Sequence, residues 1–258
     1  MNNKEKMLNI LLDLKNNYHI TALKAEFESE DITFEELLFL KNLSAKASID
    51  LCVKISGCGS VRDLFELKKA KINTIIAPMI ESKYSLEKFI STSKEIFSDK
   101  EFEKLNLIIN IETKEGIKNT DNIFSSSGFK DIKGITLGRS DLASSLNLGK
   151  NEINSLKIFE IAKELSAIIK KTGKSFLLGG KVDDKSVSFF QKMPYLTHFE
   201  TRKIIFSSSA LKTKDIEKGI LKALEFEILY LNNKKEKNQL DIKRIKSLEN
   251  KIKTFAFE

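Results

Sequence analysis

With 258 residues, the chain is long enough for one large barrel domain, and its 41% hydrophobic and 31% charged residues exclude a largely disordered protein. The net charge of +8 attracts anions in general, but no basic motif interleaved with aromatic residues is present, so we expect no nucleic-acid partner. No apolar stretch approaches the ~20 residues of a membrane span, so we expect no membrane partner.

Short apolar runs with β-branched residues recur along the chain and predict buried strands. Seven such runs cover residues 20–27, 49–56, 73–80, 105–112, 132–139, 174–180 and 196–202. An eighth strand is either the segment 203–207 or a degenerate first strand near residues 18–22.

Segments with a helical period separate these runs. They cover residues 33–47, 61–71, 85–97, 114–124, 152–173 and 185–193. Apolar strands that alternate with amphipathic helices are typical of a parallel sheet covered by helices. We favour a closed (β/α)8 TIM-type barrel over an open sheet, and assign residues 1–210 to this barrel domain.

After residue 210 the pattern changes to two amphipathic helices. An apolar stripe begins at Leu221 and Leu224 and continues to Leu231, and a second stripe includes Leu240 and Leu248. We expect residues 211–258 to form a C-terminal helical extension that packs either on its own barrel or on a neighbouring subunit. The second alternative suggests a homo-oligomer.

Functional residues of parallel barrels lie where strands end and the following loops begin, so polar residues at these positions are candidates. Glu26 and Glu28 end the first strand and share one face by the period of two. Lys54 is a cation within an otherwise apolar second strand. We expect these three side chains to be catalytic, and Lys54 also to bind substrate.

Glu112 and Asp141 lie at the ends of the fourth and fifth strands. Neighbouring strands bring such carboxylates within reach of one hard cation, whose shell water and substrate oxygens complete. We therefore expect a Mg²⁺ or Mn²⁺ site. Cys52 and Cys58 have neither a CxxC spacing nor ligand-spaced histidines, which indicates no structural zinc, no disulfide framework and a cytoplasmic location.

Two further strand ends supply arginines for substrate binding. Gly138 and Arg139 follow the fifth strand, and Arg202 shares a face with Glu200 near the end of the seventh. Arginine is suited to bidentate recognition of a carboxylate, although a structural ion pair that closes the barrel is an equal alternative for Arg202.

Five motifs in order, KISGCGSVRD, IIAPMIES, NIETKEG, GITLGRSDLASSLNLG and FETRKIIF, resemble the HpcH/HpaI aldolase and citrate lyase beta-subunit family. The resemblance covers roughly residues 20–207. It implies a phosphoenolpyruvate/pyruvate-type barrel that makes or breaks carbon–carbon bonds beside a carboxylate, with a divalent metal held at the positions of Glu112 and Asp141.

The sequence departs from the family at two positions. Lys54 stands where members commonly have an arginine that binds the carboxylate or enolate. The resemblance therefore implies that Lys54 binds this group as a point charge, or that Arg62 or Arg202 replaces the missing arginine. Where aldolases have an Asp-Gly-Glu-His type sequence, this chain has Glu26-Phe27-Glu28-Ser29, without the histidine base.

The predicted function is a metal-dependent carbon–carbon lyase or aldolase that acts on a small oxo-acid or an acyl-CoA-type substrate through an enolate. The metal polarises a keto or thioester oxygen, Lys54 and an arginine neutralise carboxylate charge, and Glu26 or Glu28 moves the proton once burial has raised its pKa. Two alternatives stay open: a non-catalytic ligand-binding or assembly protein, and a sugar-phosphate isomerase with a phosphate at Gly179-Gly180.

Overall fold

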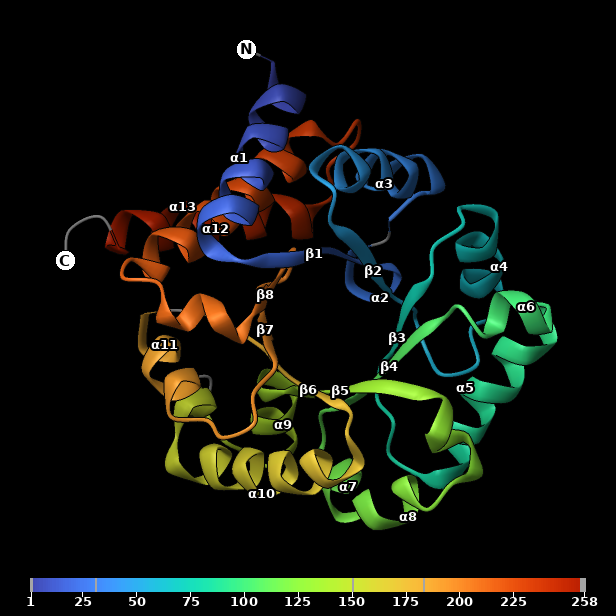
Figure 1. The fold of residues 1–258 in the computed structure, drawn as a ribbon. Helices are drawn as coiled ribbons and strands as arrows, with labels where there is room; N and C mark the ends of the chain where they lie inside the picture. Colours follow the sequence, from blue (N-terminus) through green and yellow to red (C-terminus); the bar gives the residue numbers. More distant parts are fainter. Residues whose placement is uncertain (1, 31, 150, 183, 256–258) are drawn as a thin grey trace.

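The computed structural model describes residues 2–30, 32–149, 151–182 and 184–255. Eight strands close into a barrel in chain order, with helices around it (Figure 1). The strands are β1 (Ile20–Glu26), β2 (Asp50–Lys54), β3 (Thr74–Ala77), β4 (Asn106–Ile111), β5 (Ile132–Gly138), β6 (Ser175–Gly179), β7 (His198–Glu200) and β8 (Ile204–Ser207). The predicted (β/α)8 TIM-type barrel is confirmed.

The helices follow the predicted segments and add short turns at strand ends. They are α1 (Asn3–Tyr18), α2 (Phe27–Glu30), α3 (Phe34–Ala47), α4 (Val61–Lys69), α5 (Lys83–Ile96), α6 (Asp99–Phe102), α7 (Lys114–Lys118), α8 (Thr120–Phe124), α9 (Arg139–Ser145), α10 (Leu156–Thr172), α11 (Asp184–Gln191), α12 (Ile216–Asn233) and α13 (Gln239–Phe255). Local chemistry sets their ends: Thr33 and Glu36 form a capping box before α3, and Gly173 ends α10 with φ 72°.

The last strand departs from the expected parallel sheet. β8 pairs antiparallel with both β7 and β1, whereas the other pairs are parallel. Only residues 201–203 separate β7 from β8, and a parallel connection needs a crossover of a dozen or more residues. The chain therefore turns back as a hairpin at this point, and Arg202 lies in the turn.

Alternation along the strands divides the barrel interior into layers. An apolar layer is formed by Ala22, Cys52, Ile76, Ile108, Leu177 and Ile205. Two residues further along several of these strands, the inward position is polar: Lys24, Lys54 and Asn110 follow Ala22, Cys52 and Ile108. The apolar layer thus closes the barrel below a polar floor at the carboxyl ends of the strands.

The C-terminal extension packs on its own chain. α12 contacts α1, and α13 contacts α12, so the extension packs beside the N-terminal helix (Figure 1). Leu224 and Leu231 of the predicted stripe are buried there, as is Leu248 of α13. The boundary at residue 210 stays a prediction, and residues 256–258 of the extension lie outside the described residues.

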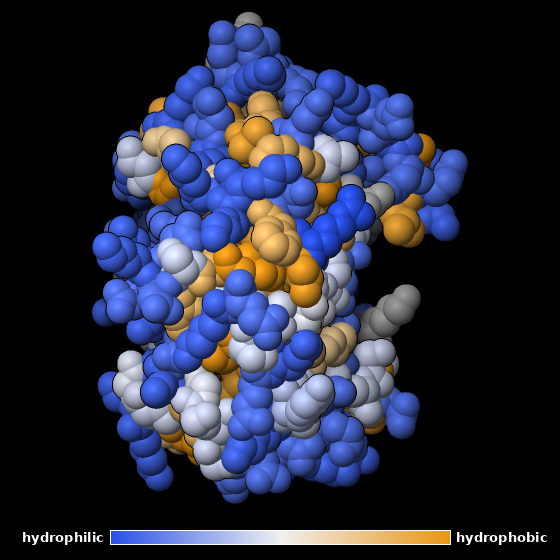
Figure 2. Space-filling model, turned by 90° about the vertical axis from the view of Figure 1, so that its right-hand side faces the viewer, coloured by the Kyte–Doolittle hydropathy of each residue, from blue (hydrophilic) through white to orange (hydrophobic). Residues whose placement is uncertain are grey.

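The surface in Figure 2 is mostly hydrophilic, with apolar side chains gathered near its centre. α4 and α5 lie on that side of the barrel (Figure 1). Val61 and Phe65 of α4 and Tyr84 of α5 are large exposed apolar residues. Exposed apolar patches are typical of protein–protein contacts, but the homo-oligomer stays a prediction. Among the described residues, no helix has the length and apolar character needed to cross a membrane; the cytoplasmic location also stays a prediction.

Candidate active site

A cavity of about 400 Å³ opens at the carboxyl ends of the strands, above the polar floor. This volume is typical of small-molecule sites. Seven of the nine predicted site residues line it, namely Glu26, Glu28, Lys54, Glu112, Gly138, Asp141 and Arg202. The structure therefore brings together side chains from β1, β2, β4, β5 and β7 and from the helices and turns that follow them.

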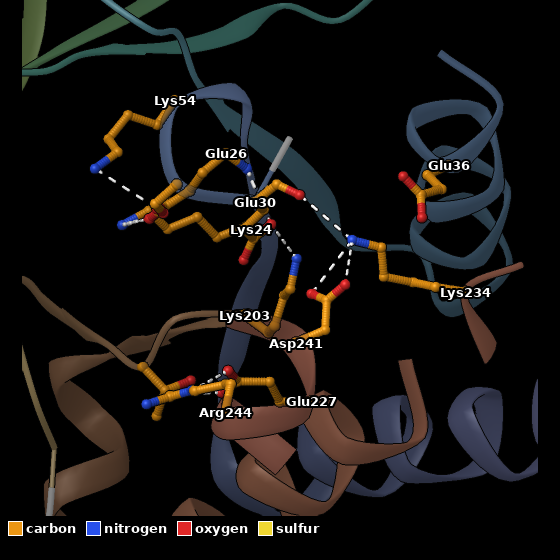
Figure 3. A network of polar contacts seen from close by, with 12 residues as sticks. Lys24, Glu26, Glu30, Glu36, Lys54, Lys203, Glu227, Lys234, Asp241 and Arg244 are labelled. Carbon is orange, nitrogen blue, oxygen red and sulfur yellow. Dashed lines mark hydrogen bonds and ion pairs between the residues drawn. The ribbon is translucent and has the colours of Figure 1, made fainter. Parts of the chain in front are cut away.

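A chain of buried charges forms the β1–β2 side of the cavity (Figure 3). Glu26 lies opposite Lys54 in the parallel register of β1 and β2, and their side chains are 3.6 Å apart. Lys54 also pairs with Glu28 at 2.7 Å, and Lys24 lies 3.3 Å from Glu26 and donates a hydrogen bond to Glu200. Lys54 is thus held by two carboxylates.

The pKa values of this cluster differ from the expected pattern. Burial raises the pKa of Glu26, but the ammonium groups of Lys24 and Lys54 outweigh it and hold that pKa well below its usual range. Burial lowers the pKa of Lys54, but the carboxylate of Glu26 leaves it raised. The expectation that burial raises the pKa of a carboxylate at this strand end is therefore wrong for Glu26, which stays ionised.

Glu112 is fixed in place by two hydrogen bonds. Its Oε1 accepts one from the backbone N–H of Met79 at 3.1 Å, and its Oε2 accepts one from Nδ2 of Asn110 at 3.1 Å. Met79 has a φ of 51°, the left-handed region that is uncommon for a residue other than glycine. Strained backbone of this kind clusters at functional sites, and here it aims an N–H at the Glu112 carboxylate.

Gly138 explains how Glu112 fits beside β5. A Cβ at position 138 would lie 2.7 Å from Cβ of Glu112 and closer still to its Oε2. Gly179 plays the same part opposite Glu200, whose Oε1 would lie 2.9 Å from an added Cβ. Gly138 and Gly179 are register partners on β5 and β6, and at both positions a larger residue would collide with the neighbouring glutamate side chain.

Glu112 and Asp141 both have features of a cation site. Burial raises the pKa of Glu112, and the negative charge of Asp141 adds to the rise. Burial also raises the pKa of Asp141, and Glu28 and Glu26 add to it. Within the described residues no group of three His, Cys, Asp or Glu side chains is arranged to hold a metal. Two carboxylates completed by water and substrate oxygens still suit Mg²⁺.

Buried oxygens without partners line the same cavity. Among the described residues, Oδ1 of Asn110, Oγ1 of Thr136 and Oε2 of Glu200 accept or donate no hydrogen bond. Asn110 and Thr136 are register partners on β4 and β5, so two of these atoms come from adjacent positions. A buried polar group without a partner is costly, and a bound ligand or its waters would satisfy these three.

The predicted arginines divide into two groups. Arg202 lines the cavity, and its guanidinium has no hydrogen-bond or ion-pair partner among the described residues. Arg139 is fully buried: it donates hydrogen bonds to the carbonyls of Gly179 (3.0 Å) and Lys181 (3.2 Å) and stacks on Phe190. Arg62 is exposed on α4. Neither Arg139 nor Arg62 lines the cavity, so the structure does not bring them to the other site residues.

Sequence reasoning missed several residues of the cavity. Lys24 precedes Glu26 by two positions, and Asn110 and Thr136 precede Glu112 and Gly138 by two, so the period of the strands could have found all three. Arg244 and Lys251 of α13 also line the cavity. Their positions on a surface helix carry no such signal.

The HpcH/HpaI aldolase/citrate lyase family matches residues 37–179, more than half of the sequence. The chain belongs to this family. The match includes Lys54, Glu112 and Asp141, and membership of the family implies a carbon–carbon lyase. No curated protein matches the sequence.

Solved structures show the same fold. The HpcH/HpaI aldolase from Desulfitobacterium hafniense DCB-2 is 13% identical, with a TM-score of 0.61 over 87% of this chain and 90% of that one. The citrate synthase SbnG is 18% identical, with a TM-score of 0.57 over 75% and 90%. An HpcH/HpaI family protein from Burkholderia cenocepacia J2315 is 11% identical, with a TM-score of 0.57 over 83% and 98%.

Proposed function

We propose that this protein is a divalent-metal-dependent carbon–carbon lyase that acts on a small oxo-acid or acyl-CoA-type substrate through an enolate. The observation that carries the proposal is the meeting, in one cavity, of two carboxylates with raised pKa values, Glu112 and Asp141, and a protonated lysine, Lys54. Opposite charges at these places suit a reaction in which negative charge develops on an oxygen.

Glu112 and Asp141 are the residues that would hold Mg²⁺ or Mn²⁺. Burial is the main cause of both raised pKa values, so each carboxylate is disfavoured in its charged form, and a bound cation would offset this penalty. When bound, the cation supplies a Lewis acid for the substrate oxygen.

Lys54 and Arg202 supply fixed positive charge. Lys54 is held by Glu26 and Glu28, so its ammonium group is oriented before substrate arrives and can stabilise charge on the carboxylate or enolate oxygen. A point charge replaces the usual arginine fork at this position. The unpartnered guanidinium of Arg202 binds the substrate carboxylate from the β7–β8 turn.

Glu28 is the better candidate for the proton transfer. Glu26 has a strongly lowered pKa, which makes it a poor base, and its carboxylate accepts a hydrogen bond from Oγ of Ser29. Glu28 lies at the rim, with its side chain 33% exposed, so it can take a proton from the substrate carbon and pass it to water. We assign to Glu26 the orientation of Lys54.

Proton exchange tests the proposal without knowledge of the second substrate. In D₂O with Mg²⁺, an enzyme that forms an enolate exchanges the methyl protons of its donor, which NMR follows as loss of the methyl signal. Exchange of pyruvate would indicate an oxo-acid donor, and exchange of acetyl-CoA a thioester donor. If neither pyruvate nor acetyl-CoA exchanged its methyl protons at Mg²⁺ concentrations that saturate the enzyme, the proposed lyase activity would be refuted and the non-catalytic alternative favoured.

The substitution Gly138→Ala should weaken metal binding about 10- to 100-fold, the range seen when residues that orient a ligand are lost. The added Cβ would press on Cβ and Oε2 of Glu112 and displace the carboxylate. Calorimetric titration with Mn²⁺ measures the change. Gly149→Ala is the matched control, because an added Cβ there meets nothing within 4 Å. Equal affinities for the two variants would show that the position of Glu112 does not matter for the metal.

A further inference from the structure

The C-terminal helix α13 contributes two cations, Arg244 and Lys251, to the cavity of the barrel. We propose that α13 completes a second anion subsite, which binds a distal carboxylate or phosphate of the substrate. The inference rests on the proposed function and narrows its substrate to molecules with two anionic groups. One group lies toward Lys54 and the proposed metal, and the other lies toward α13.

Charge is distributed unevenly around the cavity. Acids on the β1, β4 and β5 sides of the cavity are Glu26, Glu28, Glu112 and Asp141. Among the described residues that line the cavity, the β6, β7 and α13 sides carry Lys181, Arg202, Arg244 and Lys251, and the acid on these sides is Glu200, which accepts a hydrogen bond from Lys24. Positive charge on one side of a low-dielectric cavity attracts an anion to that side.

Arg244 is held toward the cavity by a buried carboxylate. Its Nε donates to Oε1 of Glu227 at 2.6 Å and its Nη2 to Oε2 at 3.0 Å, and Glu227 is 1% exposed (Figure 3). A bidentate pair of this geometry fixes the plane of the guanidinium. Glu227 is therefore a positioning residue, and Arg244 is rigid at the edge of the subsite.

Lys251 lies beside the segment that follows β6. Its Nζ donates to the carbonyl of Val182 at 3.4 Å, and Lys181, the residue before Val182, also lines the cavity. Two lysines from segments far apart in the sequence thus line the same cavity. Lysine ammonium groups bind carboxylates and phosphates as point charges, which leaves both ligands suited to this subsite.

The α12–α13 unit is also tied to the catalytic side of the barrel. Lys234, which follows α12, pairs with Asp241 of α13 at 3.1 Å and donates to the carbonyl of Glu30 in α2 at 3.4 Å (Figure 3). α2 carries Glu28, which pairs with Lys54. The extension is therefore fixed to the helix that carries Glu28, which suits a substrate-binding element.

Calorimetric titration in the presence of Mg²⁺ tests the inference with pyruvate, which has one carboxylate, and with 2-oxoglutarate and 2-oxoadipate, which have two. We expect at least one dicarboxylate to bind about tenfold more tightly than pyruvate, and Lys251→Gln to remove most of this advantage while leaving pyruvate binding unchanged. Lys246→Gln, an exposed lysine on the same helix, is the control and should change neither.

A competition experiment with inorganic phosphate distinguishes the two kinds of distal group. Competition with the dicarboxylate in the wild type, but not in Lys251→Gln, would identify a phosphate-type distal group, and absence of competition would identify a carboxylate. Equal binding of one-carboxylate and two-carboxylate acids, with pyruvate methyl exchange intact, would overturn the second subsite and leave the proposed function standing. If no oxo-acid binds in the presence of Mg²⁺, both fail.

Discussion

The variant Asp141→Asn should lose Mg²⁺-dependent methyl exchange by more than about 100-fold, because the substitution removes a carboxylate that would hold the cation itself, and even residues that only orient a ligand cost 10- to 100-fold. Asp141 lines the cavity in the first turn of α9, where its pKa is raised by burial and by neighbouring carboxylates. Asparagine keeps the shape of the side chain and removes its charge. Initial exchange rates at several Mg²⁺ concentrations measure the effect.

The aspartate of α8 is the matched control. Asp121 also lies in the first turn of a helix but is exposed and does not line the cavity. Asp121→Asn removes the same favourable interaction with the helix dipole and should leave exchange unchanged. If Asp141→Asn retained wild-type exchange, Asp141 would be a structural helix-start carboxylate and the metal role would be withdrawn.

The substitution Lys203→Met should destabilise the fold by about 3–5 kcal/mol, the cost of leaving a buried charge without its partner. Lys203 is fully buried, pairs with Glu30 and lies 4.1 Å from the ring centroid of Tyr230. Glu30 is itself buried and its Oε1 has no partner among the described residues. Urea unfolding at pH 7 measures the loss.

Two further measurements separate this ion pair from simple packing. Burial already raises the pKa of Glu30, and loss of Lys203 raises it further. The cost of Lys203→Met should therefore shrink as the pH falls through this raised pKa, because a protonated carboxyl needs no counter-charge. The double variant Lys203→Met/Glu30→Gln should recover most of the stability. A double variant no more stable than the single one would show that the charge pair is not the cause.

The strand positions were predictable from the sequence because barrel strands are buried on both faces and read as continuous apolar runs. β4 and β5, for example, coincide with the predicted runs to within a residue or two. The direction of β8 was not predicted, although the short 201–203 connection allows only a hairpin. The sequence left residues 203–207 as one of two options for the eighth strand.

The acids of the candidate site were predictable because each lies at or just after the end of a strand: Glu112 follows β4 directly, and Asp141 lies three residues after β5. The pKa values of these acids could not be predicted from the sequence. The pKa of Glu26 depends on Lys24 and Lys54, and Lys24 is in turn held by Glu200, 176 residues away. The state of a buried carboxylate is thus set by groups that only the closed barrel brings together.

Arg139 is a predicted site residue that the fold places outside the cavity. Its position after β5 made it a candidate for substrate binding, but two phenylalanines of α11 and the carbonyls around Gly179 enclose it. A strand-end arginine has the same local sequence whether it faces the cavity or packs beneath the neighbouring loop. The cations of α13 were missed for the corresponding reason, because docking of the extension, rather than any motif, brings them to the cavity.

Calorimetric titration of the metal-free wild-type protein with Mg²⁺ or Mn²⁺, with and without oxalate, tests whether the cavity binds a divalent cation together with an enolate-like anion. Oxalate is a planar dianion that resembles the enolate of pyruvate. We predict one divalent cation per chain, bound more tightly when oxalate is present because cation and anion share the site between Glu112, Asp141 and Lys54. No binding of either cation, with or without oxalate, would contradict the proposal that this barrel is a metal-dependent lyase.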